Sequence, residues 1–187
     1  MEETEIKRKV LPAVTIAALF FIGLATVFIA SASEISPENI ISAINRERES
    51  VGLSPLTTNQ NLNQAAYTKS SDMLARNYFE HYAYGLTPWM FIIRSGYEYS
   101  VAGENLAKGF STSEDIVKAW MKSPTHRQNI LNPEYQDVGV GVVQGVYSEN
   151  GEVTETTLTT EMAAKPKSPI VQFFGRITAA LSGLFGQ

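Results

Sequence analysis

The chain has 187 residues, enough for one ordinary domain with appendages, and 44% of them are hydrophobic, enough for a real core. Its formal net charge of −4 argues against a nucleic-acid-binding surface, which relies on clustered Lys and Arg. Cysteine is absent from the sequence, which excludes disulfides, thiolate metal sites, a cysteine nucleophile and a lipidated cysteine.

The N-terminus predicts export. An almost unbroken apolar run from Val10 to Ala30 follows Lys7-Arg8-Lys9, and about 20 helical residues span a bilayer core. The basic flank stays in the cytoplasm, so the rest of the chain lies outside. Ala30-Ser31-Ala32 resembles a signal-peptidase site, whereas the length of the run favours a retained anchor. Residues 1–32 are therefore a signal peptide or a membrane anchor, and the protein is secreted or membrane-anchored at the cell surface.

Three helices are expected next. Ser36-Pro37-Glu38 begins the first, which ends at Gly52 and has a solvated stretch over residues 45–49. The second runs from Thr58 or Asn59 to about Tyr78, with its buried stripe formed by Leu62, Ala65, Ala66, Lys69, Met73, Leu74 and Tyr78. A short helix over residues 89–94 follows and ends at Gly96.

The second half changes from helices to strands. Residues 97–101 alternate too briefly to predict a strand, and Gly103 is expected to form a turn that aims Glu104. A capping box at residues 111–114 begins a helix that stops before Pro124, and a further turn covers residues 126–131. From Asp137, valines alternate with glycines, which is typical of a strand whose backbone is closely approached by another segment. Asn150-Gly151 predicts a hairpin. This order predicts an α+β layered fold.

The C-terminal part, residues 166–187, consists of a linker and an amphipathic helix with apolar residues at i, i+3, i+4 spacing. Two interpretations are open: the helix docks on its own domain, or it lies at a membrane surface. The domain between the two appendages then covers residues 33–165.

His81, Glu104 and His126 are the candidates for a site. Two imidazoles and a carboxylate suit a divalent cation such as zinc, and they also suit acid–base chemistry near neutral pH. Their spacing alone is equally compatible with histidines that cap a turn and a helix. No GxSxG, P-loop or GxGxxG motif is present, so nothing supports a hydrolase elbow or a nucleotide site.

Residues 36 to about 163 resemble the CAP superfamily (SCP domain) of the bacterial type. The resemblance rests on five segments in this order: Phe79-Glu80-His81, Arg94-x-x-Tyr97, Ala102-Gly103-Glu104-Asn105-Leu106-Ala107, residues 119–131 (AWMKSPTHRQNIL) and Val138-Gly139-Val140-Gly141. It implies a three-layer α-β-α sandwich with a cleft that carries two His and two Glu residues.

The resemblance assigns His81, Glu104 and His126 to three of these four positions, and Ser123 stands where eukaryotic members have the other Glu. Losing that carboxylate makes a tightly held zinc or calcium ion less favourable, and Glu114 and Asp137 are the alternatives for it. The residues expected to bind a ligand are thus His81, Glu104, His126 and Ser123, and a metal would take the first three.

Two functions follow. The first is an extracytoplasmic module that binds a small molecule, a lipid or a cell-envelope component. The second is a hydrolase, a peptidase or a cell-wall enzyme, with His126 or His81 as base and Glu104 as acid or orienting group. A binding cleft tolerates the gap at Ser123 better than an acid–base or metal hydrolase does, so binding is favoured.

Overall fold

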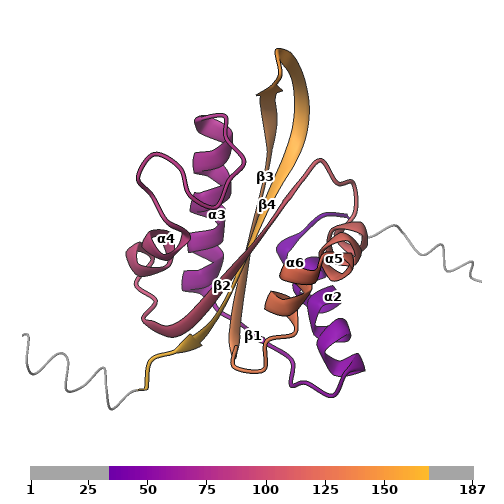
Figure 1. Cartoon of the computed structure of the whole chain (residues 1–187), viewed down its shortest axis with the longest axis vertical. Coiled ribbons are helices and arrows are strands. Elements are labelled where there is room, and N and C mark those ends of the chain that lie inside the picture. The colour runs from indigo at the N-terminus through magenta and orange to yellow at the C-terminus, as the bar shows by residue number, and fades with distance from the viewer. Residues whose placement is uncertain (1–33, 169–187) are drawn as a thin grey trace, which may run out of the picture. The chain divides into compact units, whose positions relative to one another are not determined.

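The computed structural model describes residues 34–168, so the N-terminal apolar run and the C-terminal amphipathic helix lie outside the described residues. This part contains five helices and four strands (Figure 1): α2 (Pro37–Ser50), β1 (Thr57–Thr58), α3 (Gln60–Ala75), α4 (Pro88–Arg94), β2 (Tyr99–Lys108), α5 (Ser113–Lys122), α6 (Pro124–Ile130), β3 (Asp137–Glu149) and β4 (Glu152–Pro166). Within residues 34–168, no helix combines the length and the apolar character that a membrane crossing requires.

The four strands form one sheet in the order β1-β3-β4-β2. The short β1 pairs parallel with β3, and the other neighbours are antiparallel. Asn150 and Gly151 both have positive φ, 53° and 84°, as the tight turn between β3 and β4 requires, which confirms the predicted hairpin. β2 lies at the end of the sheet, where Glu104 is opposite Met162 of β4 and Asn105 is opposite Glu161.

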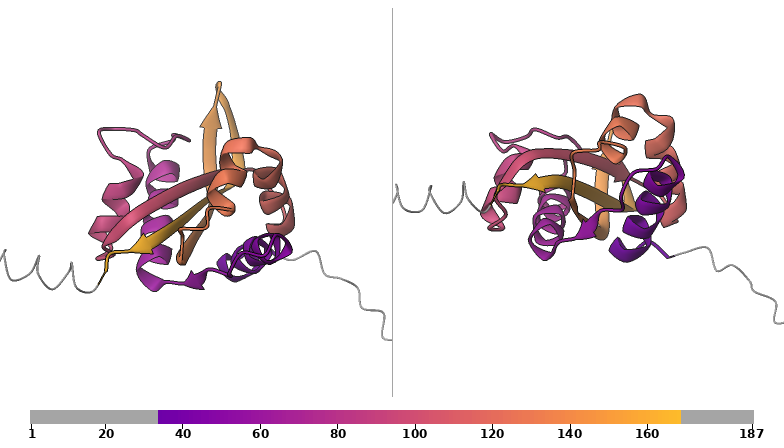
Figure 2. Two further views of the ribbon diagram at one scale, coloured as in Figure 1. Left: turned by 60° about the horizontal axis from the view of Figure 1, so that its bottom comes forward. Right: turned by 90° about the horizontal axis from the view of Figure 1, so that it is seen from below.

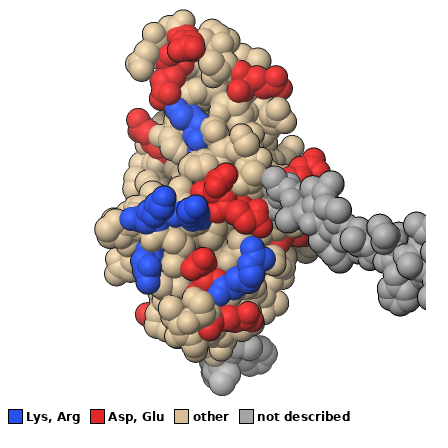
Figure 3. Space-filling model, turned by 90° about the vertical axis from the view of Figure 1, so that its right-hand side faces the viewer, with Lys and Arg blue, Asp and Glu red and all other residues tan. Residues whose placement is uncertain are grey.

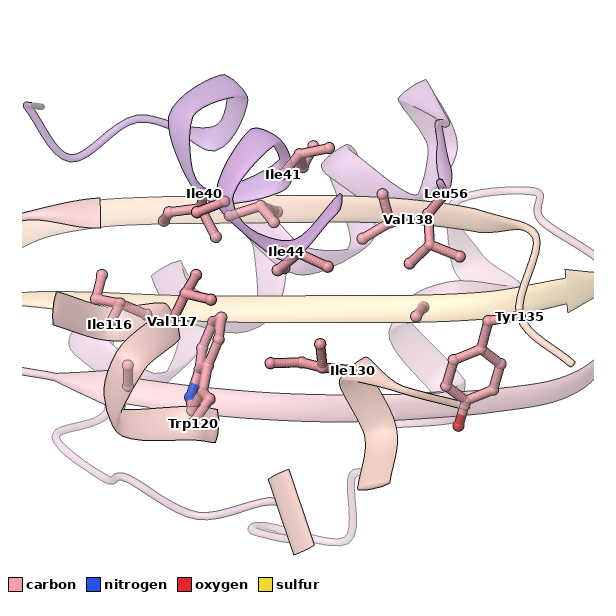
Figure 4. Close-up of a cluster of buried hydrophobic side chains, with 14 residues drawn as sticks. Ile40, Ile41, Ile44, Leu56, Ile116, Val117, Trp120, Ile130, Tyr135 and Val138 are labelled. Atoms are coloured by element: carbon pink, nitrogen blue, oxygen red, sulfur yellow. The ribbon is translucent and has the colours of Figure 1, made fainter. Parts of the chain in front are cut away.

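Helices cover the sheet on both sides, α3 and α4 on one and α2, α5 and α6 on the other (Figures 1 and 2). We call these sides the α3 face and the α2 face. Figure 4 shows the core of the α2 face, where isoleucines of α2 meet Trp120 of α5, Ile130 of α6 and Val138 of β3. On the α3 face, the core contains Leu62, Ala65, Ala66, Phe91, Ile92, Tyr97, Met162 and Ala164.

Two glycines of β3 let α3 approach the sheet closely. A Cβ at Gly139 would collide with the backbone between Leu62 and Asn63, and one at Gly141 would collide with the backbone between Ala66 and Tyr67. This confirms the close approach that the alternating glycines predict. The approach matters for the site because α3 carries Lys69 toward β2, as described below.

The predicted helix starts are confirmed by their caps. Ser36 accepts a hydrogen bond from the Asn39 amide, and the Thr112 hydroxyl accepts one from the Asp115 amide. The helix predicted from Thr58 or Asn59 has Asn59 as its N-cap. Its predicted end at Tyr78 was too late, because the α-helix stops at Ala75.

Two further predictions were wrong. Gly103 does not form a turn: it lies within β2, where a Cβ would stand 2.9 Å from Asn129 Oδ1 and would collide with the Tyr135 hydroxyl. Its lack of a side chain therefore makes room for groups packed against the strand. The stretch 45–49 is not wholly solvated either, because Arg48 is only 1% exposed. Its guanidinium donates to the carbonyls of Ser54, Ile130 and Asn132.

Candidate functional site

The site is centred on a contact between His81 and Glu104. His81 lies in the loop between α3 and α4, Glu104 lies on β2, and His81 Nδ1 is 2.6 Å from Glu104 Oε1. The imidazole is 45% exposed, whereas the carboxylate is only 2% exposed. An exposed ring is thus oriented by a buried carboxylate, which is the arrangement that fixes the tautomer of a histidine. When Glu104 is ionised, Nδ1–H donates and Nε2 is the nitrogen left for a ligand.

The electrostatics of Glu104 follow from its burial. Desolvation raises the pKa of the Glu104 carboxyl, and the hydrogen bond from His81 and the charge of Lys69 oppose that rise. Its second oxygen, Oε2, is buried and has no hydrogen-bond partner among residues 34–168. A buried acceptor without a partner is costly, and this one belongs to the carboxylate that contacts the exposed imidazole.

His126 lies on α6, which is on the other side of β2 from the loop that carries His81 (Figures 1 and 2). Two amides join α6 to β2. Asn105 Nδ2 donates to the His126 carbonyl, and Asn129 Nδ2 donates both to the Glu104 carbonyl and to Asn105 Oδ1. Burial lowers the pKa of His126, and the charge of His81 lowers it further.

The other predicted site residues have structural contacts. Ser123 separates α5 from α6, and its hydroxyl is 3.3 Å from that of Thr125. Glu114 forms an exposed ion pair with Arg46, and Asp137 accepts a hydrogen bond from Tyr97. None of these contacts places a carboxylate beside His81 and Glu104 as a substitute for the one missing at Ser123.

The metal prediction receives no support from this geometry. Among residues 34–168, no three His, Asp or Glu side chains are arranged so that they could hold one ion. One carboxylate oxygen of Glu104 is already engaged by His81. The assignment of a zinc or calcium ion to His81, Glu104 and His126 stays a prediction.

The predicted cleft is not among the hollows described on this domain. Four of them, with volumes from 240 to 670 Å³, are lined by residues within 34–168, and none of the four is lined by His81, Glu104 or His126. The group of the His81–Glu104 pair that a ligand could contact is the exposed imidazole of His81.

Sequence reasoning missed the most deeply buried acid of the domain. Glu161 of β4 is fully buried on the α2 face, and neither of its carboxylate oxygens has a hydrogen-bond partner among the described residues. Burial raises the pKa of Glu161 to about 8, the charge of Glu104 adds to the rise, and the charge of Arg48 opposes it. Its neighbours in the sequence, Thr160 and Met162, gave no signal that could have found it.

Comparisons with known proteins agree with this fold. The chain is 44% identical over 109 residues to YkwD of Bacillus subtilis (strain 168), and 31% identical over 116 residues to the membrane protein YlbC of the same strain. These matches cover 57% and 62% of this chain, but only 42% and 34% of the relatives. The chain thus spans less than half the length of either relative.

Two solved structures are similar. An extracellular protein with an SCP domain from Bacillus anthracis str. Ames has a TM-score of 0.59 at 26% identity, covering 69% of this chain and 40% of the other. An outer surface protein from Borrelia burgdorferi has a TM-score of 0.58 at 20% identity, covering 73% of this chain and 99% of the other.

The chain also matches a family model. Residues 41–155, more than half of the chain, match CAP, the cysteine-rich secretory protein family. The mixed α/β fold, with helices on both faces of a four-stranded sheet, is consistent with that match. This chain therefore belongs to the CAP superfamily.

Proposed function

We propose that this chain is an exported CAP-domain protein that binds a ligand at the cell surface through His81 and Glu104. The observation that carries the proposal is the contact between an exposed imidazole and a buried carboxylate, 2.6 Å apart, with the second carboxylate oxygen left without a partner. Burying an ionisable group costs free energy, and the hydrogen bond to the exposed His81 ring offsets part of that cost.

Binding is favoured over hydrolysis by the number of groups that are free to act. Glu104 is engaged in orienting His81, and its free oxygen is buried, so it is poorly placed as an exchanging acid. Acid–base hydrolysis generally needs two titratable groups that reach the substrate. Of the His81–Glu104 pair, only the His81 ring is exposed, so the pair supplies one such group instead of two.

The alternative is a hydrolase, a peptidase or a cell-wall enzyme. One observation favours it: a carboxylate that orients an imidazole through Nδ1 also prepares the opposite nitrogen to act as a general base. In that case His81 Nε2 would take the proton from a nucleophile and Glu104 would stabilise the resulting imidazolium. His126 would then be the second candidate group.

Export is supported by the basic flank and apolar run at the N-terminus, and by similar proteins described as extracellular or as an outer surface protein. The ligand would then be a small molecule, a lipid or a cell-envelope component. Nucleic acid is not proposed: Figure 3, which faces the α2 side, shows positive and negative side chains interspersed. Membrane fractionation, with mass spectrometry of the mature N-terminus, tests export and distinguishes cleavage from anchoring.

The chain has only two histidines, and both belong to the candidate site. NMR of full-length protein labelled with ¹⁵N in the histidine rings and kept in detergent therefore reports on this site alone. The probes are soluble peptidoglycan fragments, phosphatidylglycerol bicelles and zinc chloride, added separately. A fragment or lipid that shifts His81 and binds at least tenfold more weakly to His81→Ala supports the proposal.

Tyr67→Ala is the matched control, since Tyr67 is an exposed aromatic residue on α3. It should bind as the wild type does. Turnover of a peptidoglycan fragment that is lost in His81→Ala would establish the hydrolase instead. A shift of the NMR signals of both histidine rings by zinc alone would support the metal site. Ring signals that stay unchanged with every probe would contradict binding at His81.

A further inference from the structure

Lys69 of α3 is fully buried behind the loop that carries His81. Its ammonium donates to the carbonyl of Glu80 at 2.8 Å, to the carbonyl of His81 at 3.2 Å and to the Tyr78 hydroxyl at 3.3 Å. All three N–H groups are therefore used. The ammonium also lies 4.8 Å from the ring centre of Tyr78 and 5.5 Å from that of Phe91, so aromatic faces complete its surroundings.

The backbone around His81 has little else to hold it. In the described part of the chain, residues 79–82 take part in no backbone–backbone hydrogen bond outside regular elements, and they belong to no helix or strand. The adjoining anchors are the bond from the Tyr78 amide to Met73 and the bridge between Ala83 and Leu86. Between these anchors, the two carbonyls bound by Lys69 are the fixed points.

A buried ammonium costs free energy, and an alkyl side chain would fill the same space without that cost. The lysine differs from an alkyl chain in two respects that concern the site: it binds the backbone at His81, and it places a positive charge near the Glu104 carboxylate. Both effects act on the contact between His81 and Glu104. The hydrogen bond holds the loop that carries the imidazole, and the positive charge favours the ionised form of the Glu104 carboxylate.

We propose that Lys69 is a positioning residue of the His81–Glu104 pair. By binding the carbonyls of residues 80 and 81, it holds the loop so that Nδ1 of His81 meets Oε1 of Glu104 and Nε2 remains for a ligand. The inference rests on the proposed function in one respect, namely that the His81–Glu104 pair binds a ligand. The positioning itself is testable without any ligand.

The test is the Nδ1 proton of His81 in full-length protein with ¹⁵N-labelled histidine rings. A short hydrogen bond to a buried carboxylate protects this proton from exchange with water and moves its signal downfield. Glu104→Gln identifies the signal because it removes the carboxylate. Lys69→Met is expected to abolish or broaden the signal, while the signals of His126 change little.

Lys108→Met is the matched control. The Lys108 ammonium also lies over aromatic rings, 5.4 Å from that of Phe79 in the same loop, but it pairs with Glu149 at the hairpin. This variant should keep the Nδ1 signal. Lys69→Arg should restore the signal in part, because a guanidinium can donate to the same two carbonyls.

A retained Nδ1 signal in folded Lys69→Met would overturn the inference, as would equal losses in Lys69→Met and Lys108→Met. Circular dichroism establishes whether the variant is folded. If it is unfolded in buffer, trimethylamine N-oxide favours the compact state and permits the same measurement. Because no ligand is added, a failure here is distinct from a failure of the proposed binding function.

Discussion

Each face of the sheet buries one carboxylate, and the two carboxylates have different surroundings. Glu104 of β2 and Glu161 of β4 lie on neighbouring strands one register position apart, and each has a buried cation from a helix in its surroundings. On the α3 face, Glu104 meets His81, whose ring reaches solvent. On the α2 face, Glu161 is sealed, and neither of its oxygens has a partner among residues 34–168.

The comparison of Glu104 with Glu161 shows when a buried charge contributes to a site and when it only lowers the stability of the fold. At Glu104 the cost is offset by a hydrogen bond that orients an exposed ring, so the buried group acts on something a ligand can touch. At Glu161 burial outweighs the charge of Arg48 and the side chain of Asn105, and the acid holds its proton to a pKa of about 8. We therefore expect stability to depend mainly on the α2 face and ligand contacts on the α3 face.

The largest effect is expected from Arg48→Met. Arg48 donates to three carbonyls, of Ser54, Ile130 and Asn132, and its charge opposes the raised pKa of Glu161. Its loss leaves buried carbonyls without donors, so the free energy of unfolding should fall by about 3–5 kcal/mol. Urea unfolding followed by the fluorescence of Trp120, which is buried on the same face, measures it.

Arg46→Met is the control for this change. Arg46 lies on the same helix, but its side chain is 57% exposed and its ion pair with Glu114, at 3.4 Å, is on the surface. Exposed pairs of this kind contribute up to about 1 kcal/mol. Equal losses in the two variants would show that the buried cation of the α2 face is no more important than a surface one.

Glu161→Gln should stabilise the protein at neutral pH. A carboxyl whose pKa rises from 4.5 to about 8 on folding keeps its proton in the folded state and loses it in the unfolded state. The wild type therefore loses stability as pH rises through that window, by about 1.4 kcal/mol per unit. Glutamine mimics the protonated acid and does not titrate.

We expect unfolding curves of the two proteins to agree near pH 4.5 and to separate by roughly 3 kcal/mol at pH 7, with the variant more stable. Glu155→Gln, an exposed acid on the same strand, should leave the pH dependence as in the wild type. A Glu161→Gln variant that is less stable at pH 7 would mean that the ionised acid is satisfied in the folded protein.

Local signals were sufficient for much of this fold. The cap at Ser36 and the Asn150-Gly151 turn depend on a few adjacent residues, and the structure has them as predicted. The capping box predicted over residues 111–114 lies one residue later, with Thr112 accepting from the Asp115 amide. β2 could not be predicted because both of its faces are covered: Glu104 faces one layer and Asn105 the other, so alternation of polar and apolar residues disappears. Only the tertiary packing makes that strand recognisable.

The same distinction applies to the site: local motifs indicate its residues, and tertiary packing determines their contacts. Family motifs identified His81, Glu104 and His126, but no motif gives the contact between the first two or the lack of a three-ligand metal geometry among residues 34–168. Arg48 was expected in solvent because its partner carbonyl at Ile130 lies 82 positions away. Lys69 did leave a signal, since the helical repeat placed a lysine on a buried stripe, which is unusual unless its charge is paired.

The smallest effect is expected at His126 of α6. Burial lowers the pKa of His126 below 6.5, so near pH 6 the folded protein binds fewer protons there than the unfolded chain does. Stability linked to this group is present above pH 6.5 and is lost as pH falls through the lowered pKa. His126→Gln should remove that loss, with a change smaller than that of Glu161→Gln.

Ring NMR gives the direct measurement, because the chain has only His81 and His126 to distinguish. The His126 titration should lie below 6.5 in the wild type and move upward in His81→Ala, which removes the opposing charge. Unchanged titration in that variant would mean that the two rings do not interact, and His126 would then belong to the α2 face with Glu161 rather than to the site on the α3 face.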